Sequence, residues 1–105
     1  MELAFETKPL RETCESEATA KRELGSKVAK ELKRLLADLR AASSIEEMPV
    51  DKPRKTSGTC VFDLTENCRL IVAPNHTNNP LLASGSVDWA KVARIKILRI
   101  ELRHG

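Results

Sequence analysis

Residues 58–73 read GTCVFDLTENCRLIVA, and this stretch has the pattern of two short strands joined by a turn. Its two halves, 58–64 and 68–73, are rich in residues that favour β-strands, and Thr-Glu-Asn separates them. The pattern predicts a β-hairpin, with Asn67 in the left-handed conformation that asparagine tolerates in turns. With the turn at this place, Cys60 is expected opposite Val72.

The segment before this hairpin carries the strongest helical pattern. Within residues 27–42, five apolar side chains recur at helical spacing and form one face: Val28, Leu32, Leu35, Leu36 and Leu39. Ser26 is the expected N-cap, because it follows Gly25 and precedes the periodic region. Residues 9–22 predict a second, more polar helix that Pro9 opens. We therefore expect a helical hairpin.

Strands are predicted at both ends of the chain. Residues 1–7 alternate in polarity, and residues 93–105 are rich in isoleucine and leucine. In this last segment Ile95 and Ile97 share one parity, while Leu98, Ile100 and Leu102 share the other. The strand therefore either contains a bulge or changes the face that it buries. Residues 49–57 and 74–88 are expected to be loops.

The predicted order of elements is β-α-α-β-β-β, which indicates one α+β domain spanning residues 1–105. A small, twisted and mainly antiparallel sheet would carry the helical hairpin on one face. The 105 residues include 18 Lys and Arg against 15 Asp and Glu, a net charge of +3. A second core does not fit a chain of this length, and this composition is not that of a disordered or fibrous protein.

Apolar runs are too short to span a membrane, and the first residues lack the features of a signal peptide, so we expect a cytoplasmic protein with no membrane partner. The chain has one Trp, two Phe and no Tyr. This scarcity argues against a single-strand binder that stacks bases on aromatic rings. The three cysteines, at positions 14, 60 and 68, form no Cys-x-x-Cys pair. We therefore expect reduced, mostly buried thiols and no metal site.

Basic residues are concentrated in two places. Residues 27–40 hold five basic and two acidic side chains, and residues 93–105 hold four and one. Such a surface suits phosphate or an acidic partner. A solvated helix face and a basic tail explain the same pattern without a ligand.

Several segments together resemble the HigB-like branch of the RelE/ParE toxin superfamily, from bacterial type II toxin–antitoxin systems. The resemblance extends nearly end to end, through the N-terminal strand, ADLRAASSIEEM (37–48), CRLIVAP (68–74) and VDWAKVARIKILRIELRHG (87–105). Family members commonly close with Ile-Glu-Asp-Tyr-His, and the matching residues here are Ile100, Glu101, Leu102, Arg103 and His104.

The resemblance implies a RelE-like fold and a ribosome-dependent endoribonuclease that cuts mRNA in the ribosomal A site. Such toxins inhibit translation and use no metal or other cofactor. The ribose 2′-OH attacks the adjacent phosphate and leaves a 2′,3′-cyclic phosphate. The implied partners are the ribosome, mRNA and a neutralising HigA-type helix-turn-helix antitoxin.

The resemblance also suggests which side chains act. Arg69 matches an arginine of the central hairpin strand and would bind phosphate, since a guanidinium is always charged and binds two oxygens at once. His104 matches the C-terminal histidine and would transfer a proton. Four further basic residues are expected to bind RNA: Arg54, Lys55, Arg99 and Arg103. Alternatively, Arg69 is a surface arginine that balances Asp63 or Glu66.

Two positions depart from the family pattern. Arg103 stands where family members often have Tyr, and Leu102 replaces the usual Asp. These departures leave two alternatives open. In the first alternative, the chain is a catalytically weak or inactive module that binds its antitoxin. In the second, it is a ParE-like inhibitor of DNA gyrase.

Overall fold

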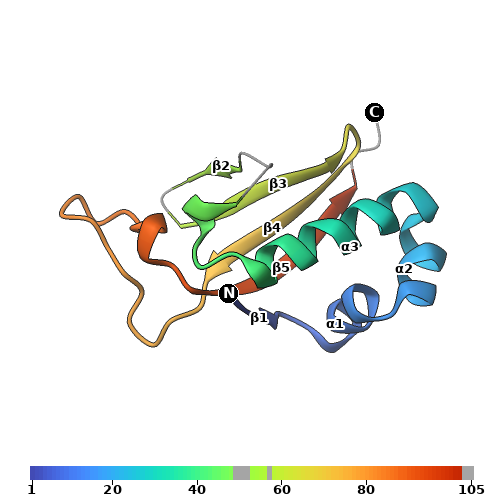
Figure 1. Ribbon diagram of the computed structural model, residues 1–105, viewed down its shortest axis with the longest axis horizontal. Coiled ribbons are helices and arrows are strands. Elements are labelled where there is room, and N and C mark those ends of the chain that lie inside the picture. The colour runs from blue at the N-terminus through green and yellow to red at the C-terminus, as the bar shows by residue number, and fades with distance from the viewer. Residues whose placement is uncertain (49–52, 57, 103–105) are drawn as a thin grey trace.

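A mixed sheet with the strand order β1-β5-β4-β3-β2 organises the chain in the computed structural model, which describes residues 1–48, 53–56 and 58–102 (Figure 1). The strands of this described part are β1 (Glu2–Phe5), β2 (Arg54–Lys55), β3 (Cys60–Thr65), β4 (Cys68–Pro74) and β5 (Arg94–Leu102). β1 runs parallel to β5, and the other neighbouring pairs are antiparallel. The predicted α+β class is therefore confirmed.

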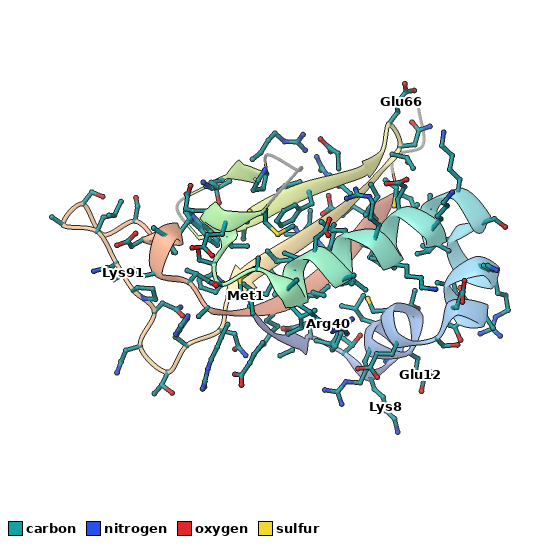
Figure 2. All side chains as sticks on the ribbon, in the orientation of Figure 1. Met1, Lys8, Glu12, Arg40, Glu66 and Lys91 are labelled. Atoms are coloured by element: carbon teal, nitrogen blue, oxygen red, sulfur yellow. The ribbon has the colours of Figure 1, made fainter. Side chains whose placement is uncertain are left out.

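Helices fill the segment between β1 and β2. They are α1 (Lys8–Glu15), α2 (Glu17–Leu24) and α3 (Ser26–Ala41), followed by the short 3-10 turn η1 (Ile45–Glu47), and a second such turn, η2 (Trp89–Lys91), precedes β5. α3 lies across one face of the sheet (Figure 1). Lys8 and Glu12 of α1 extend into solvent away from the sheet (Figure 2). In the described residues, no helix is long and apolar enough to cross a membrane.

The hydrophobic core lies between α3 and this face of the sheet. The leucines predicted to form one helical face are buried together with alternate residues of β3, β4 and β5: Leu32, Leu35, Leu36, Leu39, Cys60, Phe62, Leu70, Val72, Ile95 and Ile97. Burying each large side chain of this kind stabilises the fold by about 1.5–3 kcal/mol. The alternation that places these residues inward leaves the intervening residues on the opposite side, which we call the open face.

A β-bulge in β5 resolves the two parities of its apolar residues. Ile97 pairs with Val72 and Arg99 pairs with Ile71, so Leu98 is an extra residue between two consecutive pairs. Residues before the bulge face the core at odd positions, and residues after it face the core at even positions. The bulge thereby places Arg99 and Glu101 on the open face, and it confirms one of the two predicted solutions.

The single helix predicted over residues 9–22 is wrong, because the chain breaks at Ser16. Ser16 ends α1 and begins α2 with an extended backbone, and its side-chain oxygen accepts a hydrogen bond from the backbone N–H of Thr19 at 3.2 Å. Serine favours such caps because its hydroxyl competes for backbone groups. The predicted Ser26 cap is also wrong, since Gly25 occupies the N-cap position with a φ of 85° that favours glycine.

The β3–β4 hairpin has the predicted register but a different turn. Cys60 pairs with Val72 as expected, and Thr65 pairs with Cys68 at the turn. In the described part of the chain, φ is positive only at glycines, so the left-handed conformation predicted for Asn67 is wrong. Its backbone N–H instead donates to the hydroxyl of Thr65 at 3.3 Å. β2 lies inside the predicted loop 49–57, of which 49–52 and 57 fall outside the described residues.

His76 ties the loop after β4 to the start of β5. Its Nε2 atom accepts hydrogen bonds from the backbone N–H groups of Ala93 at 3.1 Å and Arg94 at 3.3 Å. We expect His76→Ala to raise the amide hydrogen-exchange rates of both residues up to about tenfold, because a lost hydrogen bond costs about 0.5–1.5 kcal/mol. Asn78→Ala, in the same loop, should leave these rates unchanged. Unchanged rates in the His76 variant would show that the contact is not formed in solution.

Candidate functional site

The open face of the sheet carries charged side chains that pair across neighbouring strands. At the β1 edge, Arg94 pairs with Glu2 at 2.9 Å and Lys96 pairs with Glu6 at 3.6 Å. Glu2 and Arg94 face each other in the β1–β5 ladder, where opposite charges stabilise a sheet modestly. This edge is thus a solvated surface in which each of these two cations already has a carboxylate beside it.

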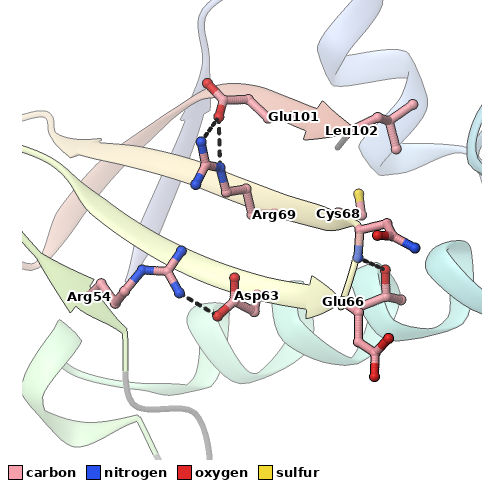
Figure 3. A pocket seen from close by; sticks show the side chains of 9 residues that line it. Arg54, Asp63, Glu66, Cys68, Arg69, Glu101 and Leu102 are labelled. Carbon is pink, nitrogen blue, oxygen red and sulfur yellow. Dashed lines mark hydrogen bonds and ion pairs between the residues drawn. The ribbon is translucent and has the colours of Figure 1, made fainter. Parts of the chain in front are cut away.

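A hollow of about 780 Å³ lies at the end of the sheet where the β3–β4 turn meets the last residues of β5 (Figure 3). Side chains from four strands and from the turn line it, among them Arg54, Asp63, Arg69, Glu101 and Leu102. The hollow is open to solvent, and its volume lies in the range of sites for small ligands. Glu66 extends from the tip of the turn at its rim (Figure 2).

Glu101 connects two arginines at this end of the sheet. Its Oε1 atom accepts from the Nε atom of Arg69 at 2.7 Å, and the Nη2 atom of Arg69 lies at the same distance (Figure 3). Its Oε2 atom accepts from the Nε atom of Arg99 at 2.6 Å. Hydrogen bonds from Arg99 and Arg69 lower the pKa of the Glu101 carboxyl group. The carboxylate therefore remains ionised at any pH where the protein is expected to work.

Asp63 supplies the second carboxylate. It accepts from an Nη1 atom of Arg54 at 2.6 Å, and it stands directly opposite Arg69 in the β3–β4 ladder (Figure 3). We call Arg54, Asp63, Arg69, Arg99 and Glu101 the arginine cluster. Its three guanidinium groups outnumber its two carboxylates, so it carries one net positive charge.

The structure brings together some of the residues predicted to act in catalysis or to bind RNA. Arg54 and Arg69 line the hollow, and Arg99 joins them through Glu101. Lys55 is not part of this group, because it pairs with Cys60 of the core-facing row and its Nζ atom contacts Glu46 of η1. Arg103 and His104 lie outside the described residues.

The partner of Arg69 was not predicted from the sequence. The alternative interpretation named Asp63 or Glu66, whereas the structure pairs Arg69 with Glu101, which is 32 residues away in the sequence. The sequence does show that Arg99 and Glu101 share a face of the last strand, because the two residues have the same parity. Only the register between β4 and β5 shows that Arg69 faces Glu101.

The cysteines are structural in character. Burial raises the pKa of Cys60 to about 12 and that of Cys14 to about 11, and it raises the pKa of Cys68 as well. A protonated thiol is a poor nucleophile, so these side chains serve packing at neutral pH. Among the residues that the structure describes, no three His, Cys, Asp or Glu side chains are placed to share a metal ion.

The arrangement of the arginine cluster suits the binding of an anion with two acceptor oxygens, because guanidinium groups bind carboxylates and phosphates in the same geometry. A scan against models of protein families matches none of them to this chain, and searches of curated proteins and of solved structures return no match either.

Proposed function

We propose that this chain is the toxin of a type II toxin–antitoxin system, a HigB-like member of the RelE/ParE superfamily with a RelE-like fold. It would act in the cytoplasm as a ribosome-dependent mRNA endoribonuclease and inhibit translation. A HigA-type helix-turn-helix antitoxin would neutralise it. The proposal is supported by the sequence resemblance and by the arginine cluster at the hollow.

One observation carries the proposal beyond the resemblance. Arg69, which matches the family arginine, lines the hollow together with Arg54 and shares a carboxylate with Arg99. Leu102 lines the same hollow, and His104 follows two residues later in the sequence. Arg54 and Arg69, which the resemblance selects from separate parts of the chain, both line this hollow, and their proximity supports the proposal.

The proposed chemistry follows from these side chains. The ribose 2′-OH gives up its proton and attacks the adjacent phosphate, and charge builds up on the phosphorane oxygens in the transition state. The P–O5′ bond then breaks, so the products are a 2′,3′-cyclic phosphate and a 5′-oxygen that takes up a proton. The guanidinium of Arg69 stabilises that charge, because a fixed cation acts most strongly where charge develops. His104 transfers a proton to or from a reacting oxygen, and Arg54 and Arg99 hold the RNA backbone. No metal or cofactor takes part in this scheme.

The proposal is tested by inducing the chain in a bacterial host and mapping new mRNA 5′ ends in a translating extract. We expect growth arrest and cuts at codon spacing that require translation. Arg22→Ala, on the exposed surface of α2, is the matched control and should behave like the wild type. Normal growth with abundant folded protein, together with no new 5′ ends, would contradict the proposal.

A second candidate is an inactive module that keeps the antitoxin-binding surface. It is favoured by the absence of Tyr from the sequence and by the pairing of Arg54 and Arg69 with carboxylates. This candidate predicts capture of a helix-turn-helix partner without codon-spaced cuts. The same extract experiment separates the two functions.

A further inference from the structure

We propose that Glu101 is an internal substitute for phosphate, which holds Arg69 and Arg99 in position until a phosphodiester of single-stranded RNA displaces it. The inference deepens the proposed function and rests on the part of it that makes RNA the ligand of the hollow. It assigns Glu101 as a positioning residue, distinct from the groups that touch the substrate.

The hydrogen-bond geometry is the first support. The two oxygens of one carboxylate receive the donors of two guanidinium groups, Arg69 on Oε1 and Arg99 on Oε2. A phosphodiester also presents two charged oxygens to such donors. The donor set is therefore already arranged around the site of a bidentate anion.

The backbone keeps that arrangement when the carboxylate leaves. Arg69 lies directly opposite Glu101 in the β4–β5 ladder, and Arg99 precedes Glu101 by two residues on the same face. These strands are anchored by buried residues on the other face, including Leu70 and Ile97. The sheet thus fixes the Cα positions of both arginines independently of Glu101.

The exposure of the three side chains allows exchange. Arg69, Arg99 and Glu101 keep 44%, 57% and 30% of their side-chain surface exposed. Exposed ion pairs contribute little to stability, so a polyanion from solvent can replace the carboxylate at low cost. The displaced carboxylate remains nearby, however, and repels the phosphate, so Glu101 weakens RNA binding.

This reasoning gives a direct test by fluorescence anisotropy with a short single-stranded RNA whose riboses are 2′-O-methylated to prevent cleavage. We expect Glu101→Gln to bind this probe about tenfold more tightly than the wild type, with a steeper dependence of affinity on salt because the probe no longer competes with an internal anion. Glu2→Gln, which removes a carboxylate from the far edge of the open face, should leave the affinity unchanged.

Equal or weaker binding by folded Glu101→Gln would overturn the inference. A measurement on the wild type makes the test independent of that variant: the Nε–H resonances of Arg69 and Arg99 and the carboxyl carbon of Glu101 should all shift on titration with the probe. No shift at Glu101 at saturation would also overturn it. If the chain cuts mRNA without these effects, only this inference fails. If the effects appear without cleavage or growth arrest, the nuclease proposal fails and this inference stands.

Discussion

Arg69→Ala is expected to lower the rate of mRNA cleavage in a translating extract by about 100- to 1,000-fold, the usual effect of removing one preorganised donor from a developing charge. Arg69 is the cation of the hollow that matches the family pattern, and its guanidinium is already oriented by Glu101. The measurement is the single-turnover appearance of new 5′ ends, with circular dichroism to show that the variant is folded.

Two matched variants make this result specific. Arg94→Ala removes a carboxylate-paired, solvent-exposed arginine from the same face but outside the hollow, and it should retain full cleavage. Arg69→Lys keeps the charge without the planar fork, so we expect an intermediate rate. Full activity in folded Arg69→Ala would exclude Arg69 from the chemistry.

The elements with strong periodicity were predictable from the sequence because their own side chains determine them. The apolar face of α3 and the alternation in β3 and β4 follow from residues close together in the chain. The register of Cys60 with Val72 follows from the position of the turn. The break at Ser16 and the short strand β2 were not predictable in this way, since a single hydroxyl or two paired residues leave no periodic signal.

The candidate site was predictable only in part, for a physical reason. Sequence parity shows which residues of one strand share a face, but it does not show how two distant strands are aligned. Arg54 meets Asp63 through the β2–β3 pairing, and Arg69 meets Glu101 through the β4–β5 pairing. Lys55 shows the same limit, because its place on the core-facing row follows from its pairing with Cys60. Long-range register therefore decides which cations share the hollow.

Deletion of Leu98 is expected to be tolerated, whereas deletion of Leu70 from the neighbouring strand should cost most of the stability of the fold. Without Leu98, Ile97 and Arg99 become consecutive and keep their partners Val72 and Ile71, so the ladder becomes regular. Only a half-buried side chain is lost, and we expect a change of about 1 kcal/mol or less in the free energy of unfolding. Urea denaturation measures this change in the free energy of unfolding, and the m-value is expected to stay the same.

Leu70 offers no such compensation. It is fully buried, and the residues around it must shift by one position when it is removed. A shift from the turn side moves the Arg69 guanidinium into the core, where an unpaired charge costs several kcal/mol. A shift from the other side puts Ala73 in the place of Val72 and leaves a cavity. The loss of the buried leucine side chain adds to this cost, and such a loss by itself destabilises a protein by about 2–5 kcal/mol. Either shift is expected to remove a large part of the free energy of unfolding, which is roughly 5–15 kcal/mol for a small domain. Equal destabilisation by the two deletions would show that Leu98 is a regular residue of the ladder. In that case a bulge would not explain why Arg99 and Glu101 lie on the open face.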